Sequence, residues 1–255
     1  MAFRTTPLIF RGALILAVSM GIALISFHTA SAQVKLPVVI PAVLPETQPE
    51  AKCLTPLEAR LIQEGFVNVR TLDPALMVDL KYAKTDNFMG ANVYGDFNCA
   101  YLRPEAALKL AEASRIIRSR YPHLRILVAD ALRPRSIQDK MWKLVVNTPR
   151  QRYVANPASG SMHNFGAAVD VTLYDITAGK PLDMGTPIDH FGPLAQPALE
   201  TGYLLSGLLS ESHLINRAIL RNAMCDAGWH SLRIEWWHFD AFPTEHVRQT
   251  YTIIE

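Results

Sequence analysis

Residues 161–170 read Ser-Met-His-Asn-Phe-Gly-Ala-Ala-Val-Asp and place His163 and Asp170 seven positions apart. Gly166 lies between them and permits a turn. Residues 167–173 alternate in polarity and are rich in β-branched side chains, which predicts a strand that carries Asp170. Taken alone, a His–Asp pair of this kind is more often a surface hydrogen bond than a metal site.

Outward from this stretch, helical and strand patterns are mixed without strict alternation. The predicted helices are 104–120, which repeats apolar residues at helical spacing, then 136–146, and 212–227, which is closed by Gly228. Two further strands are predicted at residues 124–131 and 234–239. Long helices and separated strands predict a single α+β domain with helices packed on a mostly antiparallel central sheet.

The composition is that of a globular protein, with 49% hydrophobic and 19% charged residues in 255. It excludes a disordered chain, a collagen-like repeat and a polytopic membrane protein. Without Arg4 and Arg11, which lie in the leader described next, 23 basic residues remain against 23 acidic ones. A nucleic-acid partner is therefore not expected.

The first 32 residues have the features of a secretory signal peptide. A basic start is followed by an apolar run at residues 12–27 and by the small residues Ala30 and Ala32. An uncleaved anchor is the alternative, but the run is shorter than the roughly 20 residues that span a bilayer. We expect an exported bacterial protein, periplasmic or secreted, with no stable membrane insertion once the leader is removed.

Residues 33–53 carry prolines at a regular spacing of four, at positions 37, 41, 45 and 49, which predicts a semi-rigid spacer before a domain at residues 54–255. The three cysteines, Cys53, Cys99 and Cys225, are interpreted as small buried residues. Two of them can form one disulfide in an oxidising compartment, and the sequence does not show which two.

A second candidate motif is Glu235-Trp-Trp-His238-Phe, where a carboxylate and an imidazole interrupt an apolar run. Buried polar groups need partners, so Glu235 either pairs with Arg233 or Arg221 or belongs to a site. Positions i and i+3 of a regular strand face opposite sides, so Glu235 and His238 serve one site only if the strand ends or kinks here.

Together the two motifs supply a set of metal ligands. His163, His238 and Asp170 suit one Zn²⁺ with an open coordination position, the pattern of a catalytic zinc site, although such sites also accept Co²⁺, Ni²⁺ or Mn²⁺. Glu235 is then free to act as a general base. Arg133, at the end of a predicted strand, either stabilises an oxyanion or forms an ordinary salt bridge to Asp130.

These motifs resemble the zinc D-alanyl-D-alanine dipeptidases, whose fold is shared with Hedgehog signalling domains. The similarity includes residues 82–90 (YAKTDNFMG), 130–134 (DALRP) and 182–189 (LDMGTPID), with Ile188 where the family has Phe. It covers residues 66–242, whereas residues 192–213 match no family pattern.

The resemblance implies a role for each matching residue. His163, Asp170 and His238 would bind zinc, Glu235 would be the general base and Arg133 would stabilise the oxyanion. Tyr82 and Asp189 would hold the ammonium group of the substrate, and Ser161 would meet its carboxylate.

The expected reaction is hydrolysis of D-alanyl-D-alanine, or of a related D-containing dipeptide, in peptidoglycan turnover or salvage. Two alternatives remain at this stage. One is an exported D,D-carboxypeptidase or endopeptidase that acts on peptidoglycan stem peptides. The other is a non-catalytic zinc module that binds the cell wall. The presence of Glu235 argues against this module, because a protein that only binds needs no general base.

Overall fold

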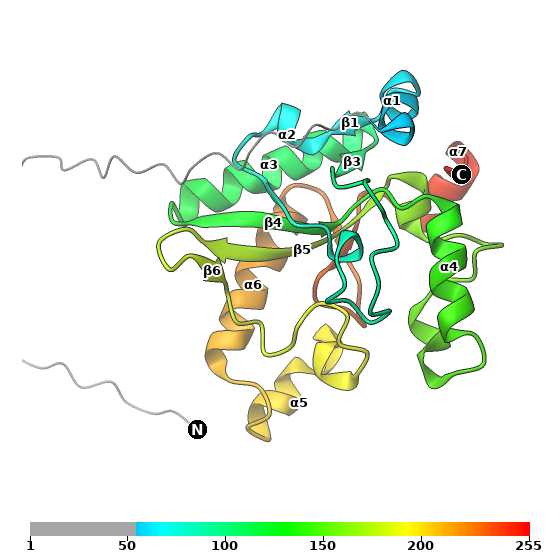
Figure 1. The fold of residues 1–255 in the computed structure, drawn as a ribbon. Helices are drawn as coiled ribbons and strands as arrows, with labels where there is room; N and C mark the ends of the chain where they lie inside the picture. The colour runs from blue at the N-terminus through cyan, green and yellow to red at the C-terminus, as the bar shows by residue number, and fades with distance from the viewer. Residues whose placement is uncertain (1–54) are drawn as a thin grey trace, which may run out of the picture. The chain divides into compact units, whose positions relative to one another are not determined.

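The computed structural model describes residues 55–255, which fold as an α+β domain around a central sheet (Figure 1). The expected signal peptide, the proline-rich spacer and Cys53 lie outside the described residues. The sheet has the strand order β2-β4-β5-β8-β7, and β6 pairs with β5 beside this path. Only the β2–β4 pair is parallel, so the predicted fold class is confirmed. The strands of this sheet are β2 (Met77–Val78), β4 (Leu124–Asp130), β5 (Ala168–Asp175), β6 (Lys180–Pro181), β7 (His230–Ser231) and β8 (His238–Asp240).

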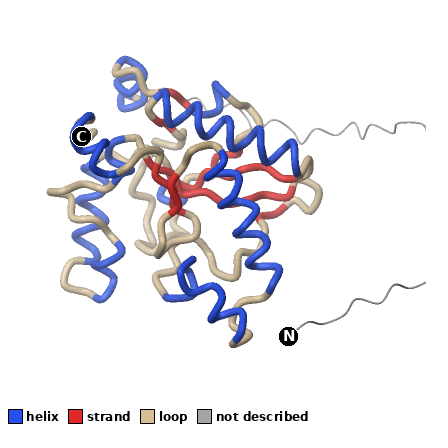
Figure 2. The backbone as a smooth tube through the Cα atoms, turned by 180° about the vertical axis from the view of Figure 1, so that it is seen from behind, coloured by secondary structure: helices blue, strands red, loops and turns tan. Residues whose placement is uncertain are grey.

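Two long helices cover one face of the sheet. Seen from behind, α3 (Pro104–Arg120) and α6 (Glu211–Asp226) lie across the strands (Figure 2), and the two helices pack on each other. On the other face, the loops at about 80–100 and 182–199 lie over the strands (Figure 1). The shorter helices are α1 (Pro56–Gln63), α2 (Val69–Leu72), α4 (Arg135–Val145), α5 (Glu200–Leu205) and α7 (Thr244–Thr250), and a separate two-stranded sheet pairs β1 (Val67–Asn68) with β3 (Tyr101–Leu102).

The middle strand β5 divides the apolar core from the polar site. Its alternation puts Val169, Val171 and Leu173, all fully buried, on one face. Asp170 and Thr172 then lie on the opposite face, under the loops. The first six residues of β5 are buried because both faces of the strand are covered.

Helix α3 spans the predicted range, with Pro104 in its first turn and Arg118 and Arg120 in its last. The predicted helices at 136–146 and 212–227 correspond to α4 and α6, and Gly228 takes a positive φ of 84° after α6. The strands predicted at 124–131 and 167–173 correspond to β4 and β5.

The strand predicted at 234–239 is wrong over its first four residues. Strand β8 begins only at His238, and residues 232–237 form the loop between β7 and β8. Trp236 is held by a neighbouring loop, because its backbone N–H donates to the carbonyl of Ala195, 3.1 Å away. Trp237 makes one bond to the sheet, where its carbonyl accepts from the backbone N–H of Val171 at 3.0 Å. This loop removes the opposition between positions i and i+3, so Glu235 and His238 can face one site.

Cys225 is an exposed free thiol, so its interpretation as a small buried residue is wrong. Cys99 is buried and disulfide-bonded. Within residues 55–255, no helix is both long and apolar enough to cross a membrane.

Gly166 is expected to be essential for the turn that precedes β5. Its φ is 65°, and a Cβ there would lie 2.7 Å from the Phe66 ring. Gly166→Ala should lower the free energy of unfolding by at least about 1 kcal/mol in urea denaturation, because strain and clash add. The control is Gly202→Ala in α5, where a Cβ meets nothing within 4 Å; it should be neutral or stabilising. Equal stabilities for the two variants would contradict this account.

Candidate metal centre and its cavity

The register of three adjacent strands assembles most of the candidate metal centre. Asp130 of β4 is directly opposite Asp170 of β5, and Asp170 is directly opposite His238 of β8. Directly opposed residues lie within side-chain reach of each other. The Asp170 Oδ1 and His238 Nδ1 atoms are 3.0 Å apart. An irregularity in the β4–β5 register between Val128 and Asp130 directs β4 into this pairing.

His163 reaches the same point from the short 3₁₀-helix η3 (Met162–Phe165). Ser161 caps this turn, and the side chain of Asn164 returns to the backbone of Ser161. Gly166 ends the turn in the left-handed conformation. The carbonyl of His163 also accepts a hydrogen bond from the backbone N–H of Arg133 at 3.0 Å, which fixes the turn to the end of β4.

The two imidazoles have their other ring nitrogens occupied. His163 Nδ1 lies 2.7 Å from the carbonyl of Ala131, and His238 Nε2 lies 3.0 Å from Asp240 Oδ1. Each ring therefore donates outward and turns its remaining nitrogen toward Asp170. The ligand atoms of His163, Asp170 and His238 all lie within 4.8 Å of one another, and the three residues are buried. Two lone pairs and a carboxylate that converge in this way fit a divalent cation.

The charges agree with this donor set. Burial alone would raise the pKa of Asp170, but His163 and His238 hold it well below its ordinary value, so Asp170 is an anion. Burial lowers the pKa of His238, but its hydrogen bonds to Asp170 and Asp240 outweigh burial and raise the pKa well above the ordinary value. In the protein without a metal, His238 therefore supplies the positive charge that a cation would replace.

Glu235 projects from the 232–237 loop into the cavity beside this cluster. Burial, together with the charges of Asp170 and Asp189, raises the pKa of Glu235 to about 7, although His238 lowers it. Its carboxylate forms no hydrogen bond or ion pair with another residue in the described range. Arg221, one of the two partners considered for it, binds Glu200 instead. A carboxylate with a pKa near neutrality and no partner suits proton transfer.

Arg133 forms the predicted salt bridge and lines the cavity as well. Its Nε and Nη2 atoms donate to Asp130, its Nη1 donates to Gln138 at 2.9 Å, and Nη2 lies 4.0 Å from Asp170. Burial by itself lowers the pKa of Arg133, but Asp130 and the other neighbours raise it well above the ordinary value. The guanidinium is therefore a fixed positive charge at the cavity wall.

Asp189 is at the other end of the cavity, with a φ of 67°. Its Oδ1 accepts a hydrogen bond from the Tyr82 hydroxyl at 2.9 Å, whereas its Oδ2 is buried without a partner among the described residues. Burial and the nearby Asp170 raise the pKa of Asp189 to about 6, against the effect of Tyr82. An unpaired buried carboxylate oxygen is costly, and a cationic group in the cavity would satisfy it.

All eight site residues predicted from the sequence line one cavity of about 340 Å³. They are Tyr82, Arg133, Ser161, His163, Asp170, Asp189, Glu235 and His238. Beside Asp189, the wall is aromatic: Phe88 packs edge-on against Phe191, which stacks on Tyr153 at 4.8 Å between ring centroids. The structure thus brings every predicted residue together.

Sequence reasoning missed the residues that orient the site. Asp240, which binds His238 Nε2, lies two positions after His238 on the same strand. Residues two apart on a strand share a face, so the sequence could have predicted this contact. Gln138 and Tyr94, which bind Arg133 and Asp130, come from other elements and give no local signal.

Two imidazoles, a carboxylate and an unpaired acid at an open cavity define a metallopeptidase type of site. The peptidase M15 family model, described as D-ala-D-ala dipeptidase, matches residues 62–254. The chain therefore belongs to this family of metallopeptidases and is a peptidase. The family predicted from the sequence motifs is confirmed.

Curated relatives agree with the family assignment. A D-alanyl-D-alanine dipeptidase of Escherichia coli K12 is 30% identical over 182 residues, which is 69% of this chain and 83% of the relative. Proteins of the same description from Enterococcus faecalis and Enterococcus faecium are 28% and 27% identical and are covered over 92% and 90% of their lengths.

The cluster predicts one bound divalent cation per chain. Asp170→Asn keeps the size of the side chain but removes the anionic ligand, so dialysed protein should retain far less zinc by elemental analysis. His230→Ala changes an exposed histidine in β7 and should leave the zinc content unchanged. Retention of a full equivalent of zinc by Asp170→Asn would contradict the assignment of this ligand.

Proposed function

We propose that the protein is a zinc-dependent dipeptidase that hydrolyses D-alanyl-D-alanine to two molecules of D-alanine. The observation that carries the proposal is the cavity itself. It has a candidate cation site and an unpaired acid at its centre, and the unpartnered carboxylate oxygen of Asp189 at one end. The names of the relatives, D-alanyl-D-alanine dipeptidase, support this substrate.

His163, Asp170 and His238 would hold the zinc ion. When bound, zinc polarises the scissile carbonyl and makes water more acidic, so that hydrolysis proceeds near neutral pH. The second ring nitrogens of the histidines remain on Ala131 and Asp240, which keeps the ligands in one orientation.

Glu235 takes a proton from the attacking water and returns it to the leaving amine. Its raised pKa, about 7, allows both transfers without a large energetic penalty. Arg133 is held by Asp130 and Gln138, so its charge is in place before the reaction begins. From the cavity wall it stabilises the negative charge that develops on the carbonyl oxygen.

The two ends of the substrate are recognised by opposite charges. Asp189 accepts the ammonium group through its free Oδ2, and Tyr82 keeps the other oxygen in place. Ser161 uses its hydroxyl oxygen as a cap for the η3 backbone, which leaves the hydroxyl hydrogen to donate to the substrate carboxylate. A peptide without a free ammonium group would leave Asp189 unpaired, which disfavours its binding.

The signal-peptide pattern supports an exported enzyme. Such an enzyme meets D-alanyl-D-alanine released from peptidoglycan or arriving from outside the cell. A role in wall turnover or salvage follows.

The test is release of D-alanine from D-alanyl-D-alanine by the chain from Gln33 onward. We expect activity that a chelator removes and zinc restores, and no turnover by Glu235→Gln at unchanged zinc content, because the base is lost. Arg233→Gln, an exposed neighbour, is the control and should keep wild-type activity.

N-acetyl-D-alanyl-D-alanine is assayed in parallel. Cleavage of this blocked substrate would favour a carboxypeptidase or endopeptidase and contradict the proposed role of Asp189. Zinc-loaded protein that cleaves neither substrate, or full activity of Glu235→Gln, would overturn the proposed reaction or its mechanism.

The contribution of Asp189 should depend on pH. Its carboxylate binds an ammonium group only when ionised, that is, above its raised pKa of about 6. The ratio of kcat/KM between wild type and Asp189→Asn should be constant above this pH and should fall about tenfold per pH unit below it. Because the charge of Asp189 also raises the pKa of Glu235, Asp189→Asn should shift the titration of Glu235 to lower pH, so that titration is measured in each variant and divided out of the ratio. A ratio that stays constant from pH 5 to 8 would count against the role of Asp189.

A further inference from the structure

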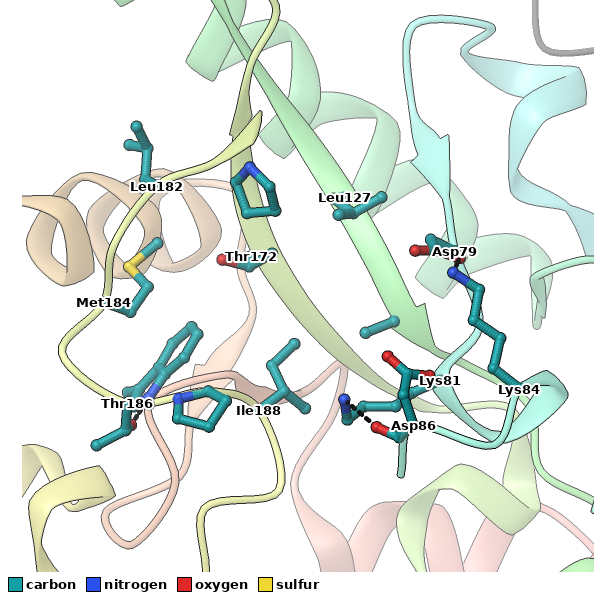
Figure 3. Close-up of a pocket in the computed structure, with 14 residues that line it drawn as sticks. Asp79, Lys81, Lys84, Asp86, Leu127, Thr172, Leu182, Met184, Thr186 and Ile188 are labelled. Carbon is teal, nitrogen blue, oxygen red and sulfur yellow. Dashed lines mark hydrogen bonds and ion pairs between the residues drawn. The ribbon is translucent and has the colours of Figure 1, made fainter. Parts of the chain in front are cut away.

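The loop that carries Asp189 forms an arch over the sheet. We call residues 184–194 the arch; Met184 and Leu194 are its two ends, and Asp189 is at its midpoint. Figure 3 shows Met184 and Ile188 with their side chains directed toward the strands β4 and β5; together with Thr186 they line a second cavity of about 240 Å³. The arch has no regular strand pairing of its own, so its position depends on other contacts.

One buried guanidinium holds both ends of the arch. Arg217, on α6, has a fully buried side chain. Its Nε donates to the carbonyl of Met184 at 2.7 Å, and its Nη2 donates to the carbonyl of Leu194 at 3.0 Å. Its Nη1 lies 3.3 Å from Glu200 Oε1. A buried charge is tolerated only when it is paired and hydrogen-bonded, and here the partners are the arch and α5.

The same guanidinium also contacts the loop that carries Glu235. Its central carbon lies 5.7 Å from the ring centroid of Trp236, the residue after Glu235. The indole N–H of Trp236 donates to Thr186 Oγ1 at 2.8 Å, the bond drawn at Thr186 in Figure 3. The Trp236 backbone N–H donates to Ala195, next to the end of the arch. Arg217, the arch and the 232–237 loop therefore form one connected unit.

We propose that Arg217 is a positioning residue that fixes the distance between Asp189 and Glu235. The first would hold one end of the substrate, and the second would act at its scissile bond. The segment 192–213, to which the sequence motifs assigned no role, thereby gains one: Leu194, Ala195 and Glu200 are the fixed points of this unit. The kinetic consequence rests on the proposed function, whereas the positioning itself does not.

Arg221 provides a matched control one turn along α6. It binds the same carboxylate, with Nη1 and Nη2 at 3.2 and 3.0 Å from Glu200. No hydrogen bond joins it to the arch or to Trp236 among the described residues. If the arginines only attach α6 to α5 through Glu200, substitutions of Arg217 and Arg221 should have similar effects. If Arg217 also fixes the arch, its substitution should have the larger effect.

The experiment compares Arg217→Lys with Arg221→Gln in the zinc-loaded mature protein. Lysine keeps the charge, but its three N–H donors are on one nitrogen atom and cannot span the separate acceptors that the planar guanidinium of Arg217 reaches. By amide hydrogen exchange, peptides that cover residues 185–196 and 233–237 should exchange at least about tenfold faster in Arg217→Lys, because the two segments open locally. Arg221→Gln should change them by less than about twofold, and peptides of β4 and β5 should be unchanged in both variants.

The kinetic measurement separates positioning from folding. At full zinc content, Arg217→Lys should raise KM and lower kcat for D-alanyl-D-alanine, with kcat/KM reduced about 100-fold, because a small misplacement of reacting groups is costly. Arg221→Gln should retain kcat/KM. If the wild type does not cleave this dipeptide, the proposed function fails, and hydrogen exchange alone decides the positioning role.

Any of three results would overturn the proposal. The exchange rates of both segments could be unchanged in Arg217→Lys, or the two arginine variants could have equal effects. The third result is a uniform increase in exchange rate over the whole chain, which would indicate that Arg217 contributes only to stability. If Arg217→Lys does not fold, Thr186→Val replaces it. That variant keeps the side-chain size but removes the hydroxyl oxygen that accepts from both the Trp236 indole and, at 3.5 Å, Arg217 Nη2. It should accelerate exchange in 233–237 and lower kcat/KM, and wild-type values in both would contradict the proposal.

Discussion

A buried carboxylate, that of Asp170, is the constraint on which the remainder of the site depends. An ionised group inside a protein requires positive charge and hydrogen bonds close by. The sheet places His238 directly opposite it, the η3 turn brings His163 to it, and Arg133 lies 4.0 Å away. Each of these groups is held in turn by Asp240, Ala131 or Asp130. The concentric arrangement explains why so many polar side chains are tolerated beside an apolar sheet.

The site combines rigid and irregular elements. The candidate ligands Asp170 and His238 lie on paired strands, where register fixes them, whereas Glu235 and Asp189 lie on loops. Loops are normally mobile and variable, so catalytic groups on them need external attachment. The buried contacts of α6 with the arch supply this attachment, so the helix that covers one face of the sheet also organises the loops of the other.

Sequence patterns predicted correctly those helices and strands whose ends are determined by neighbouring residues in the chain. Helix α3 has its proline start and cationic end in the sequence, and the His163–Asp170 motif contains its own turn and strand. The prediction of a strand at 234–237 was wrong because buried aromatic residues look alike in a strand and in a loop covered by neighbours. Arg217 gave no signal, since a single arginine in a helix usually faces solvent and its partners are more than 16 residues away. The eight predicted site residues, which the structure places in one cavity, could be selected because five motifs of the dipeptidase family occur in order along the chain.

The ligands are unevenly spaced along the chain. His163 and Asp170 belong to one short stretch, but His238 is 68 residues beyond Asp170. Closing a segment of this length has an entropic cost that local contacts do not repay. A cation bound by all three residues therefore favours the closed chain, and its binding energy is linked to the docking of β8. Two of the three ligands are available as soon as the β5 region forms. Full affinity appears only when the β7–β8 hairpin has joined the sheet, so metal uptake reports the docking of that hairpin.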